Sequence, residues 1–167
     1  AKGLLSFVDS YRKFTAIPKP NIRSFEVKPL IDKILHLEEK CINEKNIQVE
    51  LREAGEHTEW LADEKLITQV LVNLVKNAVE AITDTEPKKI RISINRLADG
   101  KVQVEVSNTG NPISKEVLPH IFIPFFTTKD SGTGIGLSIS RYIMRLHGGK
   151  LTHATSAEGW TVFTVIS

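Results

Sequence analysis

The chain has 167 residues, which is enough for one domain with a hydrophobic core and a short extension. Its 22 basic and 20 acidic residues leave a net charge of +2, so the composition gives no reason to expect nucleic acid or a membrane surface as a partner. The single cysteine, Cys41, excludes an intramolecular disulfide, and no cysteine-based zinc site suggests itself. We find no signal peptide and no apolar run of the ~20 residues that a membrane span needs.

The first 51 residues predict two helices and two short strands. Apolar residues recur every three or four positions from 4 to 16, which indicates a helix, and Pro18 and Pro20 end it. This helix has no evident partner, so we expect it to be the tail of a preceding element in a longer protein. A strand at 24–27, a helix at 29–43 and a strand at 47–51 are predicted to follow.

The remaining residues complete an α+β fold. Asp63 favours an N-cap for a strong helix that runs to about residue 82. Strands at 88–96 and 102–106 flank Ala98-Asp99-Gly100, a typical hairpin signal. A helix at 136–146 precedes two final strands, at 151–155 and 160–166. We therefore expect a two-layer sandwich, in which about three helices cover a mixed, mostly antiparallel sheet.

The stretch 107–135 has only short helical pieces, and loops longer than ~15 residues in a compact domain are usually functional. The helix at 63–82 supplies a second candidate, because Gln69, Asn73, Asn77 and Glu80 share one of its faces. The ordinary alternative is a solvated face, but such faces prefer Lys, Glu and Arg to asparagine. The opposite apolar arc is wide enough to bury most of the helix, so the carboxamides need partners. One suitable partner is Mg²⁺ that bridges phosphates.

The segment Gly132-Thr133-Gly134-Ile135-Gly136-Leu137 opens the helix at 136–146. Glycines at alternate positions can expose backbone N–H groups, and the positive end of a helix adds to them, which makes a phosphate cradle. A flexible surface loop is the alternative. Thr127-Thr128-Lys129 lies just before and offers hydroxyl groups and a cation.

Two further segments are less specific by themselves. Phe122-Ile123-Pro124-Phe125-Phe126 reads either as a buried corner of the core or as a hinge whose aromatic side chains repack when a nucleotide binds. Asn108, with Gly110 nearby, follows a strand and could place a carboxamide against a purine edge, although an ordinary turn explains the same residues.

In order and spacing, these four pieces resemble the N, G1, F and G2 boxes of the sensor histidine kinases, a family of gyrase-like ATPases with the Bergerat fold. The match runs from about residue 24 to the C-terminus, and the helix at 4–16 with its proline exit resembles the end of the second dimerization helix in nitrogen-regulator-type kinases. The resemblance implies residues 1–20 as a remnant of the dimerization helix and linker, and residues 21–167 as the ATP-binding catalytic domain.

The resemblance also implies roles for individual residues. Asn77 would ligate Mg²⁺, and Asn73 would lie at the same catalytic centre beside the phosphates of ATP. Lys76 could face these phosphates, and Asn108 with Gly110 would contact the adenine. The remaining cofactor-binding positions, under a mobile lid, would be Thr128, Lys129, Gly132, Thr133, Gly134, Ile135, Gly136 and Leu137.

The implied reaction transfers the γ-phosphate of ATP to a histidine and from there to an aspartate of a response regulator. None of the five histidines has the His-Glu-x-x-x-Pro context of the family's phosphoacceptor, so we expect the acceptor to lie outside this fragment. The expected partners are ATP, the protein's own dimerization domain and a response regulator, without nucleic acid. We expect the longer protein to be a cytoplasmic homodimer, with a membrane anchor as one option.

Two departures from family patterns keep alternatives open. The G1 box usually reads D-x-G-x-G, whereas this chain has Asn108 and Pro112, which leaves a degenerate nucleotide-binding module as one alternative. Gyrase-like hydrolases and chaperones usually carry a glutamate four residues before the Mg²⁺ asparagine. Asn73 stands there, and a neutral amide cannot act as a general base, which argues against a hydrolase and favours a kinase.

Overall fold

The computed structural model describes residues 2–84, 86–130 and 132–167, of which 2, 6, 10 and 14 are described by their backbone alone. A five-stranded sheet forms one layer, in the order β2-β4-β5-β7-β6. The strands are β2 (Gln48–Glu53), β4 (Lys89–Arg96), β5 (Val102–Asn108), β6 (Lys150–Thr155) and β7 (Thr161–Ile166). β2 and β4 pair in parallel and the other neighbours are antiparallel, so the predicted mixed, mostly antiparallel sheet is confirmed.

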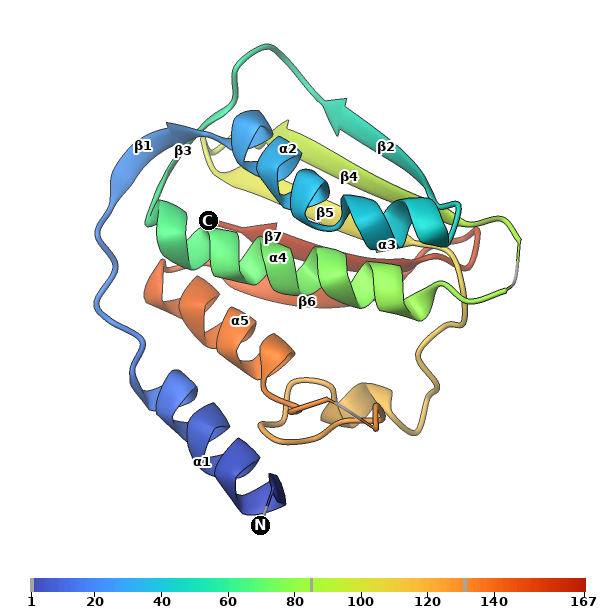
Figure 1. Cartoon of the computed structure of the whole chain (residues 1–167). Helices are drawn as coiled ribbons and strands as arrows, with labels where there is room; N and C mark the ends of the chain where they lie inside the picture. Colours follow the sequence, from blue (N-terminus) through green and yellow to red (C-terminus); the bar gives the residue numbers. More distant parts are fainter. Residues whose placement is uncertain (1, 85, 131) are drawn as a thin grey trace.

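Helices form the second layer, in front of the sheet in Figure 1. They are α2 (Val27–Leu37), α3 (Glu39–Glu44), α4 (Glu64–Ala81) and α5 (Gly136–Leu146). The inward positions of the strands alternate with half-exposed ones, and β4 buries Ile90, Ile92 and Ile94 against this layer. The core therefore lies between the sheet and the helices, as expected for a two-layer α+β fold.

α4 is the central helix of this layer. Eight of its apolar side chains are buried, and each of them other than Ala78 stabilises the fold by roughly 1.5–3 kcal/mol. Asp63 is its N-cap as predicted, because a carboxylate oxygen accepts a hydrogen bond from the backbone N–H of Leu66 at 3.1 Å. At the other end, Nζ of Lys45 donates to the carbonyl oxygens of Val79 and Ile82, at 2.8 and 2.9 Å. Both ends of α4 are thus fixed by side chains.

Two predictions from the sequence were wrong in detail. The single helix predicted at 29–43 is two helices, α2 and α3, with Glu38 between them at φ −93° and ψ 1°. Leu37, which the periodicity placed on the apolar face, is 71% exposed, so the break keeps Ile34 and Ile42 buried and turns Leu37 outward. No strand was predicted for β3 (Glu59–Ala62), which pairs with β1 (Arg23–Glu26) in a separate two-stranded sheet.

The first helix, α1 (Lys2–Thr15), lies beyond α5 on the side away from α4 (Figure 1). Its exposed side chains include Leu4, Leu5 and Tyr11. Residues 16–22 then run along the edge of the molecule to β1 (Figure 1). No helix in the described part of the chain is both long and apolar enough to cross a membrane.

Candidate nucleotide site

A cleft of about 680 Å³ lies between the helix layer, the ends of two strands and the long connection from β5 to α5. One wall is built by α4, the last residue of β5 and the first residues of β7. The other wall, here named the lid wall, is the segment 111–135, with a short 3₁₀ helix at Leu118–His120. The cleft is lined by every predicted site residue except Gly110 and Ile135.

Gly110 and Ile135 lie behind the cleft. The Cα of Gly110, at φ +109°, packs so closely on the end of α4 that an added Cβ would lie 2.6 Å from the carbonyl oxygen of Ala81. Ile135 is 5% exposed and packs in the core, and its carbonyl oxygen accepts hydrogen bonds from Ser138 and Ile139. Both residues shape the backbone around the cleft without lining it.

The two asparagines of α4 differ in surroundings, although both are half-buried and line the cleft. Nδ2 of Asn73 donates to Oγ of Ser140 on α5, at 3.3 Å. The amide of Asn73 also lies against Gly136, where an added Cβ would come within 2.2 Å of Asn73 Oδ1. Asn73 therefore joins α4 to the first turn of α5 and explains why that turn begins with glycine.

Asn77 lies one turn further along α4, and its Oδ1 accepts a hydrogen bond from Nζ of Lys129 at 3.1 Å. The same ammonium donates to a carboxylate oxygen of Glu80 and forms an ion pair with it. The carboxamide oxygen predicted to hold Mg²⁺ thus already faces a cation, which comes from the lid wall.

The glycine segment, residues 132–137, packs tightly against residues 125–127 of the lid wall. An added Cβ on Gly134, at φ +71°, would lie 2.4 Å from the carbonyl carbon of Phe125, and one on Gly132 would lie 2.5 Å from Oγ1 of Thr127. Only glycine fits such approaches, and the positive φ of Gly134 is a further requirement for it. The helix that follows has no side-chain N-cap and no acidic residue in its first turn. Its first N–H groups and positive end can therefore receive phosphate oxygens.

The aromatic segment of the lid wall, residues 122–126, contacts α1. Phe125 has a positive φ of 68°, and its N–H donates to the carbonyl of Gly134 at 2.8 Å. Its ring lies 4.7 Å from the ring of Phe7 on α1, measured between centroids. Phe122 and Phe125 pack against the core from partly buried positions, whereas Phe126 lines the cleft. The segment therefore combines a corner of the core with a wall of the cleft.

The cleft is also lined by buried polar side chains from the sheet. Asn108 is 3% exposed, and its Nδ2 donates to the carbonyl of Thr109 at 2.7 Å, which leaves Oδ1 as the acceptor available to a ligand. Thr161 on β7 is the strand partner of Asn108, is 6% exposed and also lines the cleft. Sequence reasoning missed Thr161. The sequence does offer a signal: Thr161 is a polar residue on the same inward-facing side of β7 as the buried Phe163 and Val165.

The comparisons with known proteins identify this arrangement. Residues 62–167 match the family model described as "Histidine kinase-, DNA gyrase B-, and HSP90-like ATPase". A solved structure of the catalytic domain of histidine kinase ThkA is similar over 87% of this chain and 94% of its own, with 39% identity and a TM-score of 0.77. The chain belongs to this ATPase family, as a sensor histidine kinase catalytic domain.

Longer relatives agree with this assignment. The sensor protein FixL of Bradyrhizobium diazoefficiens is 37% identical over 152 residues, which cover 91% of this chain and 30% of FixL. The sensor histidine kinase ZraS of Escherichia coli is 32% identical over 144 residues, 86% of this chain and 30% of ZraS. The kinase domain thus spans about a third of the length of these curated relatives, and it binds ATP as the family name states.

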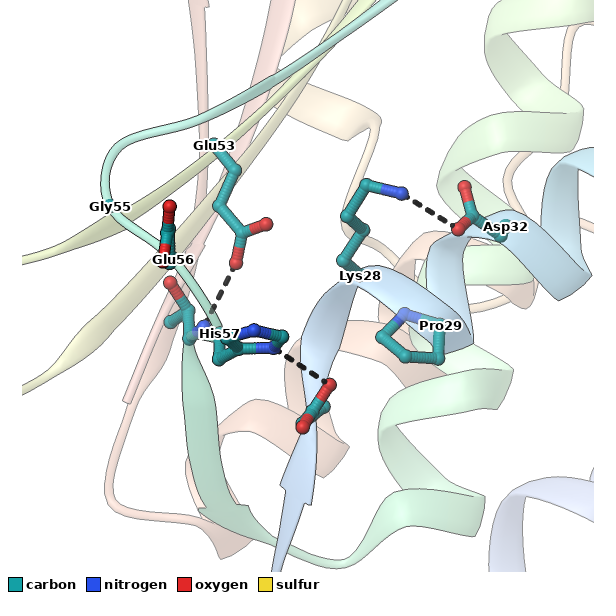
Figure 2. A pocket seen from close by; sticks show the side chains of 9 residues that line it. Lys28, Pro29, Asp32, Glu53, Gly55, Glu56 and His57 are labelled. Carbon is teal, nitrogen blue, oxygen red and sulfur yellow. Dashed lines mark hydrogen bonds and ion pairs between the residues drawn. The ribbon is translucent and has the colours of Figure 1, made fainter.

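A second hollow of about 500 Å³ lies away from the nucleotide cleft, where β1 meets α2 and β2 leads toward β3. Figure 2 shows two pairs among its side chains: Lys28 pairs with Asp32 at 3.1 Å, and His57 Nδ1 lies 3.6 Å from Glu26. Glu53 accepts the N–H of Thr58 at 2.9 Å. Within the described residues, no group of three or more His, Cys, Asp or Glu side chains could hold a metal. Both pairs are largely exposed, so they contribute little to stability.

Proposed function

We propose that the kinase domain binds Mg²⁺-ATP in the cleft and transfers the γ-phosphate to a histidine that lies outside this chain, on the protein's dimerization domain. The phosphate then passes to an aspartate of a response regulator. Histidine kinase ThkA, which is 34% identical to this chain with a TM-score of 0.79, has been solved in complex with the response regulator protein TrrA, and this complex supports a response regulator as partner.

The observation that carries the proposal is the position of Asn77 Oδ1. It faces the ammonium of Lys129 at 3.1 Å, at the end of the cleft where the uncapped first turn of α5 and the glycine segment present backbone N–H groups. A neutral carboxamide oxygen suits Mg²⁺, which binds through a few protein oxygens and otherwise through phosphates and water. Asn77 would hold the ion, while Lys76, Thr128, Lys129 and the glycine backbone would hold the phosphates.

The other cleft residues support positioning of ATP without its hydrolysis. Asn73 occupies the place where hydrolases of this superfamily have a glutamate, and its amide is engaged with Ser140 and cannot take a proton from water. Asn108 Oδ1, with Thr161 beside it, would accept a hydrogen bond from the adenine amino group. Phosphoryl transfer needs mainly positioning and charge stabilisation, and this cleft offers both.

We also propose a division of the chain into two parts. Residues 1–20 contain α1 and would be the end of the dimerization helix with its linker, and residues 21–167 would be the catalytic domain. The ring contact between Phe7 and Phe125 connects α1 directly to the lid wall. We place the domain in the cytoplasm, where ATP is available, within a homodimeric kinase.

Titration calorimetry with a non-hydrolysable ATP analogue, with and without Mg²⁺, tests the proposal. We expect the wild-type chain to bind the analogue and to bind it more tightly with Mg²⁺. Asn77→Ala should abolish the Mg²⁺-dependent part and leave the fold intact, because its side chain is half-buried at the cleft and outside the core.

Asn43→Ala is the matched control, since Asn43 is an exposed helical asparagine on α3 that does not line the cleft. It should bind like the wild type. Absence of binding by the wild-type chain at millimolar analogue would refute the catalytic role, and unchanged Mg²⁺ dependence in Asn77→Ala would refute the metal role of Asn77.

A further inference from the structure

The charges that line the nucleotide cleft include one that is unexpected for a polyphosphate site. Among the described lining residues, Lys76 and Lys129 are the two cations, and Glu80 is the one carboxylate. A carboxylate beside bound phosphates is repulsive unless it has a partner, and at short range such repulsion is substantial. Glu80 therefore needs a reason to be on the cleft face of α4.

The partner of Glu80 is the lysine of the lid wall. Nζ of Lys129 donates both to the Glu80 carboxylate and to Oδ1 of Asn77, although Lys129 is separated from these residues by 49 and 52 positions in the chain. Glu80 and Asn77 are three residues apart on one helix, so their oxygens converge on one point above it. An ammonium has three donors and can satisfy both oxygens at once.

On the basis of the function proposed above, we propose that Glu80 holds Lys129 on the metal-binding oxygen of Asn77 whenever the cleft lacks nucleotide. The ammonium then occupies the place of the cation that Mg²⁺-ATP brings. Binding of Mg²⁺-ATP must displace Lys129 from Asn77 and from Glu80, and Lys129 becomes available to the phosphates. Glu80 is thus a positioning residue that makes nucleotide binding compete with a contact between the lid wall and α4.

The solvent exposure of Lys129 and Glu80 limits how strongly their contact competes with nucleotide binding. The side chains of Lys129 and Glu80 are 45% and 39% exposed, so water and salt weaken their attraction. Ion pairs in such places change equilibrium constants by about 1.5- to 5-fold. The contact therefore sets the affinity for nucleotide within a modest range and cannot keep the cleft closed against ATP.

The experiment compares wild type, Glu80→Gln, Lys129→Gln and the double variant by calorimetry with Mg²⁺ and a non-hydrolysable ATP analogue. We expect Glu80→Gln to bind about 2- to 5-fold more tightly than wild type, because a neutral amide at this position holds Lys129 without charge attraction. Lys129→Gln should bind more weakly, since a phosphate contact is lost. In the Lys129→Gln background, Glu80→Gln should no longer tighten binding, because the residue it restrains is absent.

A second measurement reports the contact without nucleotide. Trypsin cleaves after lysine, so the initial rate of cleavage after Lys129, followed by mass spectrometry in the absence of ligand, should rise in Glu80→Gln. Glu44→Gln is the matched control, because Glu44 on α3 also forms an exposed pair with a lysine, Lys40, at 3.9 Å and lies outside the cleft. It should change neither the affinity nor the cleavage rate.

The outcomes separate this inference from the proposed function. If wild type binds the analogue with Mg²⁺ dependence but Glu80→Gln binds equally or more weakly, the competition is disproved, and weaker binding would show that Glu80 supports the metal instead. Tightening that persists in the Lys129→Gln background would also overturn it. If the wild-type chain does not bind the analogue at all, the proposed function itself fails.

Discussion

The two walls of the nucleotide cleft are held in place by different forces. The wall formed by α4, β5 and β7 is continuous with the core, and Ala78, Asn108 and Thr161 are at most 6% exposed. The lid wall is mostly exposed. Among its described backbone hydrogen bonds, only the one from Phe125 N–H to the carbonyl of Gly134 joins residues more than four positions apart. We therefore call the first the core wall.

This difference predicts how substitutions act. A change in the core wall alters packing that the whole domain shares, so its effect on stability accompanies its effect on binding. A change in the lid wall alters a segment that contributes little to the core, so binding can be lost while the free energy of unfolding is nearly kept. The predictions below test this separation, in order of decreasing effect.

The largest effect is expected for Gly134→Ala in the lid wall. The new Cβ would meet the carbonyl carbon of Phe125 at 2.4 Å, and φ +71° costs a non-glycine residue about 1–2 kcal/mol. The contact between Phe125 and Gly134 must then open, and the backbone N–H groups that we propose to bind phosphate move. We expect analogue affinity to fall by at least about tenfold, or ~1.4 kcal/mol, in addition to a stability loss from backbone strain of about 1–2 kcal/mol.

Gly159→Ala is the matched control for backbone strain. Gly159 has a similar φ of +85°, but nothing lies within 4 Å of an added Cβ. Calorimetry and thermal unfolding of both variants separate the effect of backbone strain, which both share, from the effect of the clash with Phe125, which only Gly134→Ala has. If Gly159→Ala reduces affinity as much as Gly134→Ala, the close approach to Phe125 has no part in binding.

The next largest effect is a loss of stability, expected from a substitution of Asp63, the N-cap residue of α4. Its carboxylate accepts hydrogen bonds from the N–H groups of Leu66, at 3.1 Å, and Asn21, at 2.8 Å, so it also attaches the linker to α4. Asp63→Ala should lower the free energy of unfolding by about 1–2 kcal/mol, a usual value for a lost N-cap. Affinity for the analogue should change less than in Gly134→Ala, since Asp63 does not line the cleft.

The pH dependence of this effect follows from the pKa of Asp63. Burial by itself raises the pKa of the carboxyl group, but hydrogen bonds from the N–H groups of Asn21, Leu66 and Lys65, with His147 nearby, leave the pKa below its ordinary value. The folded pKa is therefore lower than the unfolded one, near ~3.9. The stabilisation is complete above about pH 4 and is lost as the pH falls through the folded pKa.

Urea unfolding of wild type and Asp63→Ala between pH 3 and 7 measures this dependence. Their difference in unfolding free energy should be constant above about pH 5 and shrink below about pH 4. Asp63→Asn keeps one acceptor oxygen, so its cost relative to wild type should be intermediate at neutral pH and should also shrink on acidification. Because neither asparagine nor alanine titrates at this position, the difference between Asp63→Asn and Asp63→Ala should not vary with pH. A wild-type advantage over Asp63→Ala that grows on acidification would contradict the role assigned to the carboxylate.

The same division of the walls explains what the sequence could predict. α4 was predicted almost to the residue because Asp63 caps it and its apolar residues are periodic, and the asparagine face was noticed because it breaks the usual polar pattern. β3 was missed because the apolar Leu61 is 69% exposed, so the residue types of Glu59–Ala62 do not alternate as their burial does. Thr161 was missed because threonine is ordinary in a strand, and only its place opposite Asn108 makes it notable.

For the lid wall, the sequence indicated which residue types matter, but it did not indicate which residues contact one another. The glycines and Lys129 signalled phosphate binding, but the contact of Lys129 with Glu80 spans 49 positions and depends on the path of a segment without regular structure. The close approach of Gly136 to Asn73 likewise joins two helices whose packing no local pattern encodes. Local signals thus identified most of the predicted residues that line the cleft, while tertiary packing decided which of them meet.

The smallest effect on binding is expected for Asn108→Asp in the core wall. The substitution restores the aspartate that the family usually has, and charge-assisted hydrogen bonds are roughly twice as strong as neutral ones, so analogue affinity should stay equal or rise a few-fold. The structure adds a cost, because Nδ2 of Asn108 donates to the Thr109 carbonyl at 2.7 Å and a carboxylate cannot. The nucleotide-free variant should therefore lose about 1 kcal/mol of stability.

Thermal unfolding with and without the analogue, next to calorimetry, tests both parts of this prediction. The variant should unfold earlier than wild type when free, and saturating analogue should narrow the difference, because a ligand that binds only the folded state stabilises it more when its affinity is higher. A clear loss of affinity would instead mean that the Thr109 contact is needed to aim this side chain at the adenine. In that case the core wall would depend on asparagine at this position, and the neutral G1 box would be a requirement of this cleft.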